Sequence, residues 1–427
     1  MKNNVFSSRN FRLVFLGALV SELGALMYSF AVSFYILEIS GNSAFLQGLY
    51  LALCGVAMLI FTPIGGVLGD RFNKARIMFL CDFIKGGTIL LATVLLLLMP
   101  DAKAQIWILF LLGILGNAVS GIFNPAAGAL LPRIVQEDQL QQANSYFVMK
   151  NAFESILGVI LAGILYAALR IQTLFLFVGL CFIASGISEM LIRYDHEPSS
   201  ERLTLQLAVR DMGDGIHYLK TKNGLLPFLV GSLFINFFAE PLMGNFTPYF
   251  IKTDLASAPS YLLDRVLTPE LWSSVFNVCF GISSLLGAAI LSARVQDEKC
   301  GHKTALRICW FAVLLILLTV GYWQFVDRGV SLNAFLITLC LAYLAIGFLI
   351  SWINIPISTV MMRIVDKDKL SKVNSISSLG SMGLTPIASV LGGLLLETGT
   401  LSLMIFCTLG FTATGVLMLF SRSLREI

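Results

Sequence analysis

Twelve long apolar runs dominate this sequence of 427 residues. An α-helix needs roughly 20 such residues to cross the hydrocarbon core of a bilayer, and each run reaches that length. The runs are continuous rather than alternating, and in lipid only helices or closed barrels satisfy their backbone, so helices are predicted. The expected spans are 11–37, 44–69, 76–99, 105–130, 142–168, 171–192, 224–251, 271–294, 304–326, 331–357, 373–396 and 400–421.

The composition supports a membrane protein with many spans. Residues of the set AVILMFWYC make up 57% of the chain and charged residues 13%, against roughly 45–50% and about 25% in soluble domains. A water-soluble protein of this size needs more charge to wet its surface. Low hydrophobicity, which disorder requires, is also absent.

The basic residues of the loops predict the orientation. Twelve spans place both termini on one side, and 22 of the 29 Lys and Arg fall on that side, against five on the other. Loops rich in Lys and Arg remain in the cytoplasm, so both termini are expected there.

The longest loop on the cytoplasmic side divides the chain. Residues 193–223 carry charges of both signs and form the expected linker between two six-helix halves, 1–192 and 224–427. Within the linker, 203–219 has the pattern of an amphipathic helix lying on the membrane surface.

The two halves share a repeated motif at an offset of 230 residues. Both copies lie in cytoplasmic loops, so the halves run in the same direction and are related by an axis along the membrane normal. This arrangement occurs in transporters that bind substrate between two parallel halves. The matching positions are Asn124, Arg133, Asp138, Leu140 and Asn144 in the first copy, and Asn354, Arg363, Asp368, Leu370 and Asn374 in the second.

The loop between the second and third spans reads GVLGDRFNKAR from Gly66 to Arg76, which resembles the signature loop of the major facilitator superfamily. Further motifs, at Asp82–Lys85, Phe123–Asn144 and Asp214–Leu219, are similar to its drug-exporting branch, which includes bacterial macrolide efflux proteins. The resemblance implies an all-α integral membrane protein of twelve helices in two parallel repeats, located in the bacterial cytoplasmic membrane.

The resemblance also implies a conformational gate at this loop. The glycines let the second helix pack closely, and Asp70 would meet the cytoplasmic end of the eleventh span. A basic loop that only sets topology is the alternative. Asn73 replaces the usual glycine and is expected to tolerate a left-handed backbone there. The expected gate residues are Gly66, Asp70, Arg71, Lys74, Arg76, Asp82 and Lys85.

Two departures weaken the inference of proton antiport relative to that of transport. The fourth span lacks the buried Arg that the family often uses in proton coupling, and the antiporter pattern of the fifth span lacks its proline. What is left of that pattern predicts helix-packing positions at Gly158 and Gly163, with a better copy at Pro386, Gly392 and Gly393.

Carboxylates within spans are costly and need a reason, at least about 2.5 kcal/mol each on insertion scales. Glu22 lies near the middle of the first span, and Glu240, followed by Pro241, lies in the seventh, with Asn236 one turn away. We expect both carboxylates to face the central cavity, to bind protons because desolvation favours the neutral acid, and to attract cationic substrates. Pairing within helix contacts is the alternative.

Other charges within the spans have a local explanation. Lys150 and Glu154 are spaced i, i+4, which favours a mutual ion pair, although a coupling or substrate role stays open. Asp82 and Lys85 share a helix face near the inner gate, where a structural role is favoured. Glu189, with Arg193, is expected to reach the membrane interface.

The favoured function is secondary active export of amphipathic small molecules, such as macrolides and other drugs, by proton antiport and alternating access. This would confer antibiotic resistance. Export of a dedicated metabolite, siderophore or lipid is the alternative, and a membrane enzyme or sensor is the alternative from another class. The chain has no Walker loop, and its histidines (His196, His217 and His302) lie in loops, so no enzymatic activity, cofactor or metal is expected. The expected partners are a small molecule, protons and lipid, without nucleic acid, for a monomer.

Overall fold

The computed structural model consists of α-helices. It describes residues 5–136, 139–194, 218–219, 221, 225–292, 300–328, 331–365 and 370–421. Within that part of the chain no strand occurs, and twelve helical segments are long and apolar enough to cross a membrane, which confirms the predicted number of spans. The helix expected at 203–219 lies outside the described residues except for its last two positions.

The chain forms two compact units. The first unit comprises Met1–Gly41 and Leu53–Leu205, and the second comprises Asn42–Ala52 and Gln206–Ile427. The start of α2 (Ala44–Arg71) therefore belongs to the second unit, which a division into two sequential halves does not anticipate.

The helices of the first unit begin where short polar side chains can cap them. Asp101 caps α4 by accepting a hydrogen bond from Ala104 N at 2.9 Å, and Ser8 caps α1 in the same way. Such caps satisfy backbone donors that the first helical turn leaves free. Besides the later part of α2, the unit contains α1 (Arg9–Ile39), α3 (Lys74–Leu98), α4 (Ala102–Ile134), α5 (Leu140–Phe153), α6 (Val159–Ala168) and α7 (Ile171–Met190).

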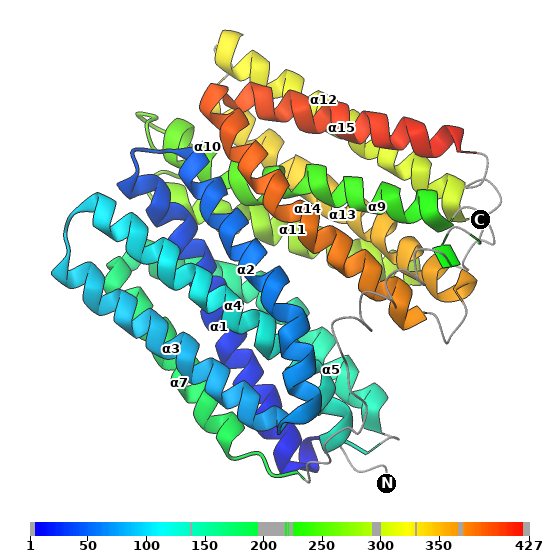
Figure 1. The fold of residues 1–427 in the computed structure, drawn as a ribbon. Helices are drawn as coiled ribbons and strands as arrows, with labels where there is room; N and C mark the ends of the chain where they lie inside the picture. Colours follow the sequence, from blue (N-terminus) through cyan, green and yellow to red (C-terminus); the bar gives the residue numbers. More distant parts are fainter. Residues whose placement is uncertain are drawn as a thin grey trace. The chain divides into compact units, whose positions relative to one another are not determined.

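Small residues allow α3 and α7 to lie side by side (Figure 1). A Cβ placed on Gly86 would come within 3.0 Å of the carbonyl oxygen of Gly179, and one placed on Gly186 would lie 3.3 Å from the carbonyl oxygen of Phe79. Close backbone approach of this kind is the usual mode of helix packing in lipid, where apolar side chains gain little from leaving the solvent.

The second unit holds the remaining helices. Gly399 alone separates the last two helices and has φ +132°, a conformation that residues with a Cβ rarely adopt, so a glycine is required there. Besides the start of α2, the unit contains α9 (Leu225–Glu240), α10 (Thr247–Phe250), α11 (Pro269–Ser292), α12 (Cys300–Arg328), α13 (Leu332–Ile364), α14 (Leu370–Thr398) and α15 (Thr400–Phe420).

Two spans contain wider, π-helical turns. In the fifth span the turn Glu154–Gly158 (η3) joins α5 to α6, and in the seventh the turns Pro241–Phe246 (η4) and Ile251–Leu255 (η5) flank α10. Pro241 has no N–H to donate, which accounts for the irregularity at that point. Both spans change geometry at a carboxylate, Glu154 or Glu240, and π-turns are frequent at functional sites.

Candidate functional site

Three charged side chains meet in the first unit. Lys150 Nζ lies 2.5 Å from Glu22 Oε2 and 2.9 Å from Glu154 Oε2. We call Glu22, Lys150 and Glu154 the charge triad. It brings together a carboxylate expected to act alone and a pair expected to act locally.

The triad is buried at one end and open at the other. The side chains of Lys150 and Glu154 are 1% and 4% exposed, whereas that of Glu22 is 50% exposed. One ammonium between two carboxylates leaves a formal charge of −1. Glu154 Oε1 is buried without a hydrogen-bond partner in the described part of the protein. Only Glu22 can therefore meet an incoming proton or cation directly.

The local sequence explains how α1 reaches the triad. Lys150 lies one turn before the π-turn that Glu154 begins, so both side chains leave the same face of the fifth span. A Cβ on Gly158 would lie 2.7 Å from Leu26 Cδ1 and 3.2 Å from Leu23 Cδ2 of α1. Glycine at this position lets α1 approach and bring Glu22 to Lys150. Gly163, one turn beyond the π-turn, is buried in α6.

Glu240 occupies a different environment in the second unit. Its Oε1 accepts a hydrogen bond from Ser389 Oγ at 3.4 Å, and the same hydroxyl lies nearer, at 3.1 Å, to the carbonyl oxygen of Thr385. Asn236, expected on the same face, is exposed and donates to the carbonyl oxygen of Ser232 at 2.9 Å. Glu240 forms no ion pair with any described residue.

The α14 glycines border this carboxylate. A Cβ on Gly392 would lie 2.7 Å from Pro241 Cβ and 3.2 Å from Asn245 Oδ1, and one on Gly393 would lie 2.5 Å from the carbonyl oxygen of Ala44. Pro386 lies buried one to two turns earlier in α14. α14 thus packs tightly against η4 and against the start of α2.

The signature loop forms a tight connection between α2 and α3. Lys74 is buried and its backbone N donates to Tyr194 OH at 2.7 Å, whereas Arg71 and Arg76 are exposed. A Cβ on Gly66 would meet no described atom within 4 Å. The side chain of Asp70 lies outside the described part of the structure.

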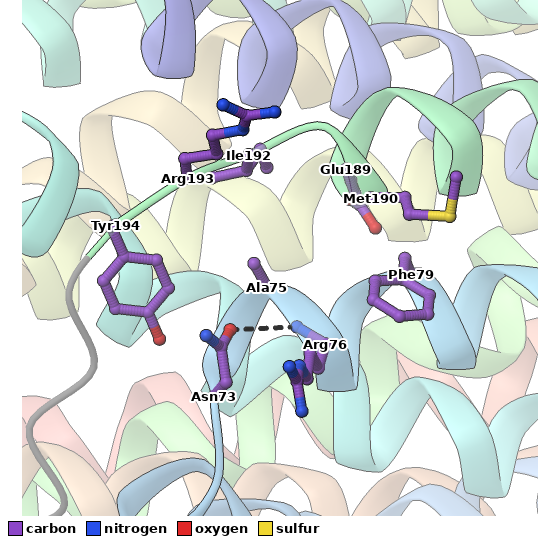
Figure 2. Close-up of a pocket in the computed structure, with 9 residues that line it drawn as sticks. All are labelled: Asn73, Ala75, Arg76, Phe79, Glu189, Met190, Ile192, Arg193 and Tyr194. Carbon is purple, nitrogen blue, oxygen red and sulfur yellow. Dashed lines mark hydrogen bonds between the residues drawn. The ribbon is translucent and has the colours of Figure 1, made fainter.

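Asn73 departs from the expectation of a left-handed backbone. Its φ is −60°, and its side chain accepts a hydrogen bond from Arg76 N at 3.2 Å (Figure 2). Asn73 is thus the N-cap of α3, a position at which Asn ranks with the most favourable residues.

Asp82 and Lys85 share a region of α3 but form no ion pair with each other. Lys85 Nζ lies 4.6 Å from the centroid of the Phe182 ring of α7, a cation–π contact. Asp82 is 1% exposed, and Glu189 of α7 is fully buried with neither carboxylate oxygen bonded to a described residue. The prediction that Glu189 reaches the membrane interface is therefore wrong, because its side chain packs inward against α1 and α3.

Sequence reasoning missed the role of Ser389, the hydroxyl beside Glu240. A lone Ser in an apolar span carries no distinguishing signal, since most such hydroxyls bond to their own helix. The described residues contain no group of three or more His, Cys, Asp or Glu that could hold a metal ion.

Comparison with known proteins places this architecture. The family model of the Major Facilitator Superfamily matches residues 14–382. The MFS-type transporter YkuC of Bacillus subtilis (strain 168) is 24% identical over 87% of this chain and 82% of its own.

Two further similarities concern an efflux protein and a solved fold. Macrolide efflux protein A of Streptococcus pyogenes is 23% identical over 60% of this chain and 65% of its own. The crystal structure of a bacterial homologue of the iron transporter ferroportin, in an inward-facing state, has a TM-score of 0.70 at 17% identity and covers 95% of this chain and 98% of its own. The chain belongs to the Major Facilitator Superfamily, and it is a multi-pass membrane transporter rather than an enzyme.

Proposed function

We propose that this transporter exports amphipathic, cationic small molecules from the bacterial cytoplasm in exchange for protons. The charge triad supports this proposal most directly. Glu22 is half exposed, yet it is bonded to a Lys150 that is almost completely buried. A site of this kind can take up one positive charge from solvent while its counter-ion stays fixed.

The charge of the triad favours exchange. With Lys150 cationic and both carboxylates ionised, one negative charge is left to be balanced. A proton on Glu22, or the ammonium group of a substrate beside it, supplies that balance, but the two together would leave an excess positive charge. Proton and cation therefore compete for Glu22, and such competition is what antiport requires.

The cycle that we propose is alternating access of two parallel halves, as in other transporters built from such repeats. The similarity to a macrolide efflux protein supports the outward direction. Asp70, Arg71, Lys74 and Arg76 would stabilise one end state at the cytoplasmic side. The protein would act as a monomer with both termini in the cytoplasm.

The test is accumulation of ethidium and of a labelled macrolide in an efflux-deficient bacterium, with and without this protein and a protonophore. We expect lower accumulation that the protonophore restores. Glu22→Gln should abolish the difference. Glu38→Gln is the matched control, since Glu38 lies on the same helix and bonds Tyr166 OH at 3.2 Å, away from the triad.

Unchanged accumulation of both compounds, with the protein verified in the membrane, would contradict export of drugs. That result would favour a dedicated exporter of a metabolite, siderophore or lipid. A protonophore-insensitive decrease would contradict proton antiport while leaving export in place.

A further inference from the structure

A second group of ionisable side chains lies in the first unit, apart from the charge triad. Asp82 and Lys85 come from α3 and Glu189 from α7, within electrostatic range of one another. α1 closes the group, because a Cβ on its Gly17 would lie 3.3 Å from Ser185 Oγ and 3.7 Å from Glu189 Cγ. Three helices thus enclose two carboxylates and one ammonium.

The two carboxylates lack partners. Asp82 is 1% exposed and its Oδ2 has no hydrogen-bond partner, and Glu189 is 0% exposed and has none for either oxygen, within the described part of the chain. Lys85 is in contact with the Phe182 ring rather than with either carboxylate. Two buried carboxylates near each other cannot both be ionised at low free-energy cost, so the pair favours a shared proton.

A cavity connects this pair with the end of the unit that the basic residues place in the cytoplasm. It has a volume of about 580 Å³ and lies between the start of α3 and the end of α7. Figure 2 shows the Glu189 carboxyl group pointing from α7 toward α3, between Ala75 and Phe79. A buried carboxyl group that lines an open cavity can exchange its proton with water.

We propose that Asp82 and Glu189 form a proton-binding site that exchanges with the cytoplasm through this cavity. In export by antiport, a proton that enters from outside must leave on the cytoplasmic side. The Glu189 carboxyl group would release it to water in the cavity, leaving a carboxylate, and the pair would be reloaded from the triad. This proposal rests on the proposed function, and it separates the exit of protons from the entry of substrate.

Other charged and titratable groups surround the pair from each neighbouring element. α3 contributes Cys81 and Lys85 and, at the cavity, Arg76. The residues after α7 contribute Arg193 and Tyr194. From α1, Glu22 lies within electrostatic range of Lys85. Lys85 thus interacts with both the pair and the triad, which gives the two sites an electrostatic link.

The first test detects the bound proton without any substrate. Infrared spectra of the full-length protein in lipid should show the C=O stretch of a protonated carboxyl group that shifts in D₂O. We expect Glu189→Gln or Asp82→Asn to remove that band. Glu189→Asp should retain it, and Glu397→Gln should leave it unchanged, because Glu397 is exposed and accepts hydrogen bonds from Ser43 Oγ and Phe45 N. A spectrum without a band dependent on Glu189 or Asp82, at every pH at which the protein stays folded, would overturn the proposal.

The second test measures the proton's route. In vesicles with a pH-sensitive dye on the cytoplasmic side, Glu189→Gln should slow substrate-driven proton release by about tenfold or more. Substrate affinity should stay within about twofold, because the pair lies outside the triad. Unchanged release by a folded Glu189→Gln protein would show a structural role and overturn the proposal. Wild-type protein without proton release would instead refute antiport, while the infrared result would still decide whether the pair binds a proton.

Discussion

The two units hold their intramembrane carboxylates in opposite ways. In the first unit, Lys150 bonds Glu22 and Glu154 at 2.5 and 2.9 Å. In the second, Glu240 receives one long hydrogen bond from a hydroxyl that lies closer to another acceptor. The difference shows that a Glu in a span can be retained either by a fixed counter-ion or by hydrogen bonding to its neutral form. Only the first arrangement couples its charge to a second residue.

Removing the shared ammonium should break the comparison most severely. Lys150→Met leaves Glu154 buried without a counter-ion, and breaking a buried pair in this way costs about 3–5 kcal/mol. Thermal unfolding of the purified protein should show this loss. Lys103→Met, on an exposed residue, is the control. The double variant Lys150→Met, Glu154→Leu should recover part of the stability, and a stable single variant would contradict a structural role for the triad.

Neutralising the exposed end of the triad should affect transport more than folding. Glu22→Gln removes the charge for which proton and substrate compete, so we expect about a hundredfold loss of proton-coupled export. The half-exposed carboxylate is screened by solvent, so stability should change by less than about 1 kcal/mol. Transport assays in vesicles, with unfolding measured in parallel, separate the two effects. A loss of stability without a loss of coupling would reverse this assignment.

Neutralising Glu240 should have a smaller effect on transport. Glu240→Gln retains a side chain that can accept the Ser389 hydrogen bond, and no described ion pair is lost. We expect export to fall by less than about tenfold, with the pH dependence of the wild type preserved, because the triad still carries the charge. The pH profile of transport is the measurement. A loss as large as that of Glu22→Gln would show that both units couple protons.

Removing the hydroxyl partner should have the smallest effect. Ser389→Ala deletes a weak hydrogen bond to Glu240, so we expect a destabilisation of no more than about 1 kcal/mol. Unfolding of the single and double variants with Glu240→Gln gives the interaction energy. A coupling well above that value would mean that Ser389 holds Glu240 in place as firmly as Lys150 holds Glu22.

The sequence was sufficient to predict the fold. Each span is a long apolar run, and span length is set by bilayer thickness, so the number and type of elements were correct. The i, i+4 spacing of Lys150 and Glu154 likewise predicted their contact, because it depends on helix geometry alone.

Contacts between helices were less predictable. That Glu22 of α1 reaches Lys150 depends on a close approach at Gly158, and that Glu189 is buried depends on the crossing of α1, α3 and α7. Neither is encoded in local spacing. The N-cap role of Asn73 was missed for another reason: comparison with a glycine in relatives suggested a backbone conformation, whereas the Asn side chain provided a cap.

The π-turn at Glu154–Gly158 has a consequence for insertions and deletions. A π-turn accommodates one residue more than the α-helix it interrupts, so losing one residue there can restore a regular helix. Every side chain on one side of that point then rotates by roughly 100° relative to the other. Loss of Ser155 would turn Lys150 away from the face that α6 presents to α1. In this span, a change of one residue in length can therefore disrupt the triad while every charged group is retained.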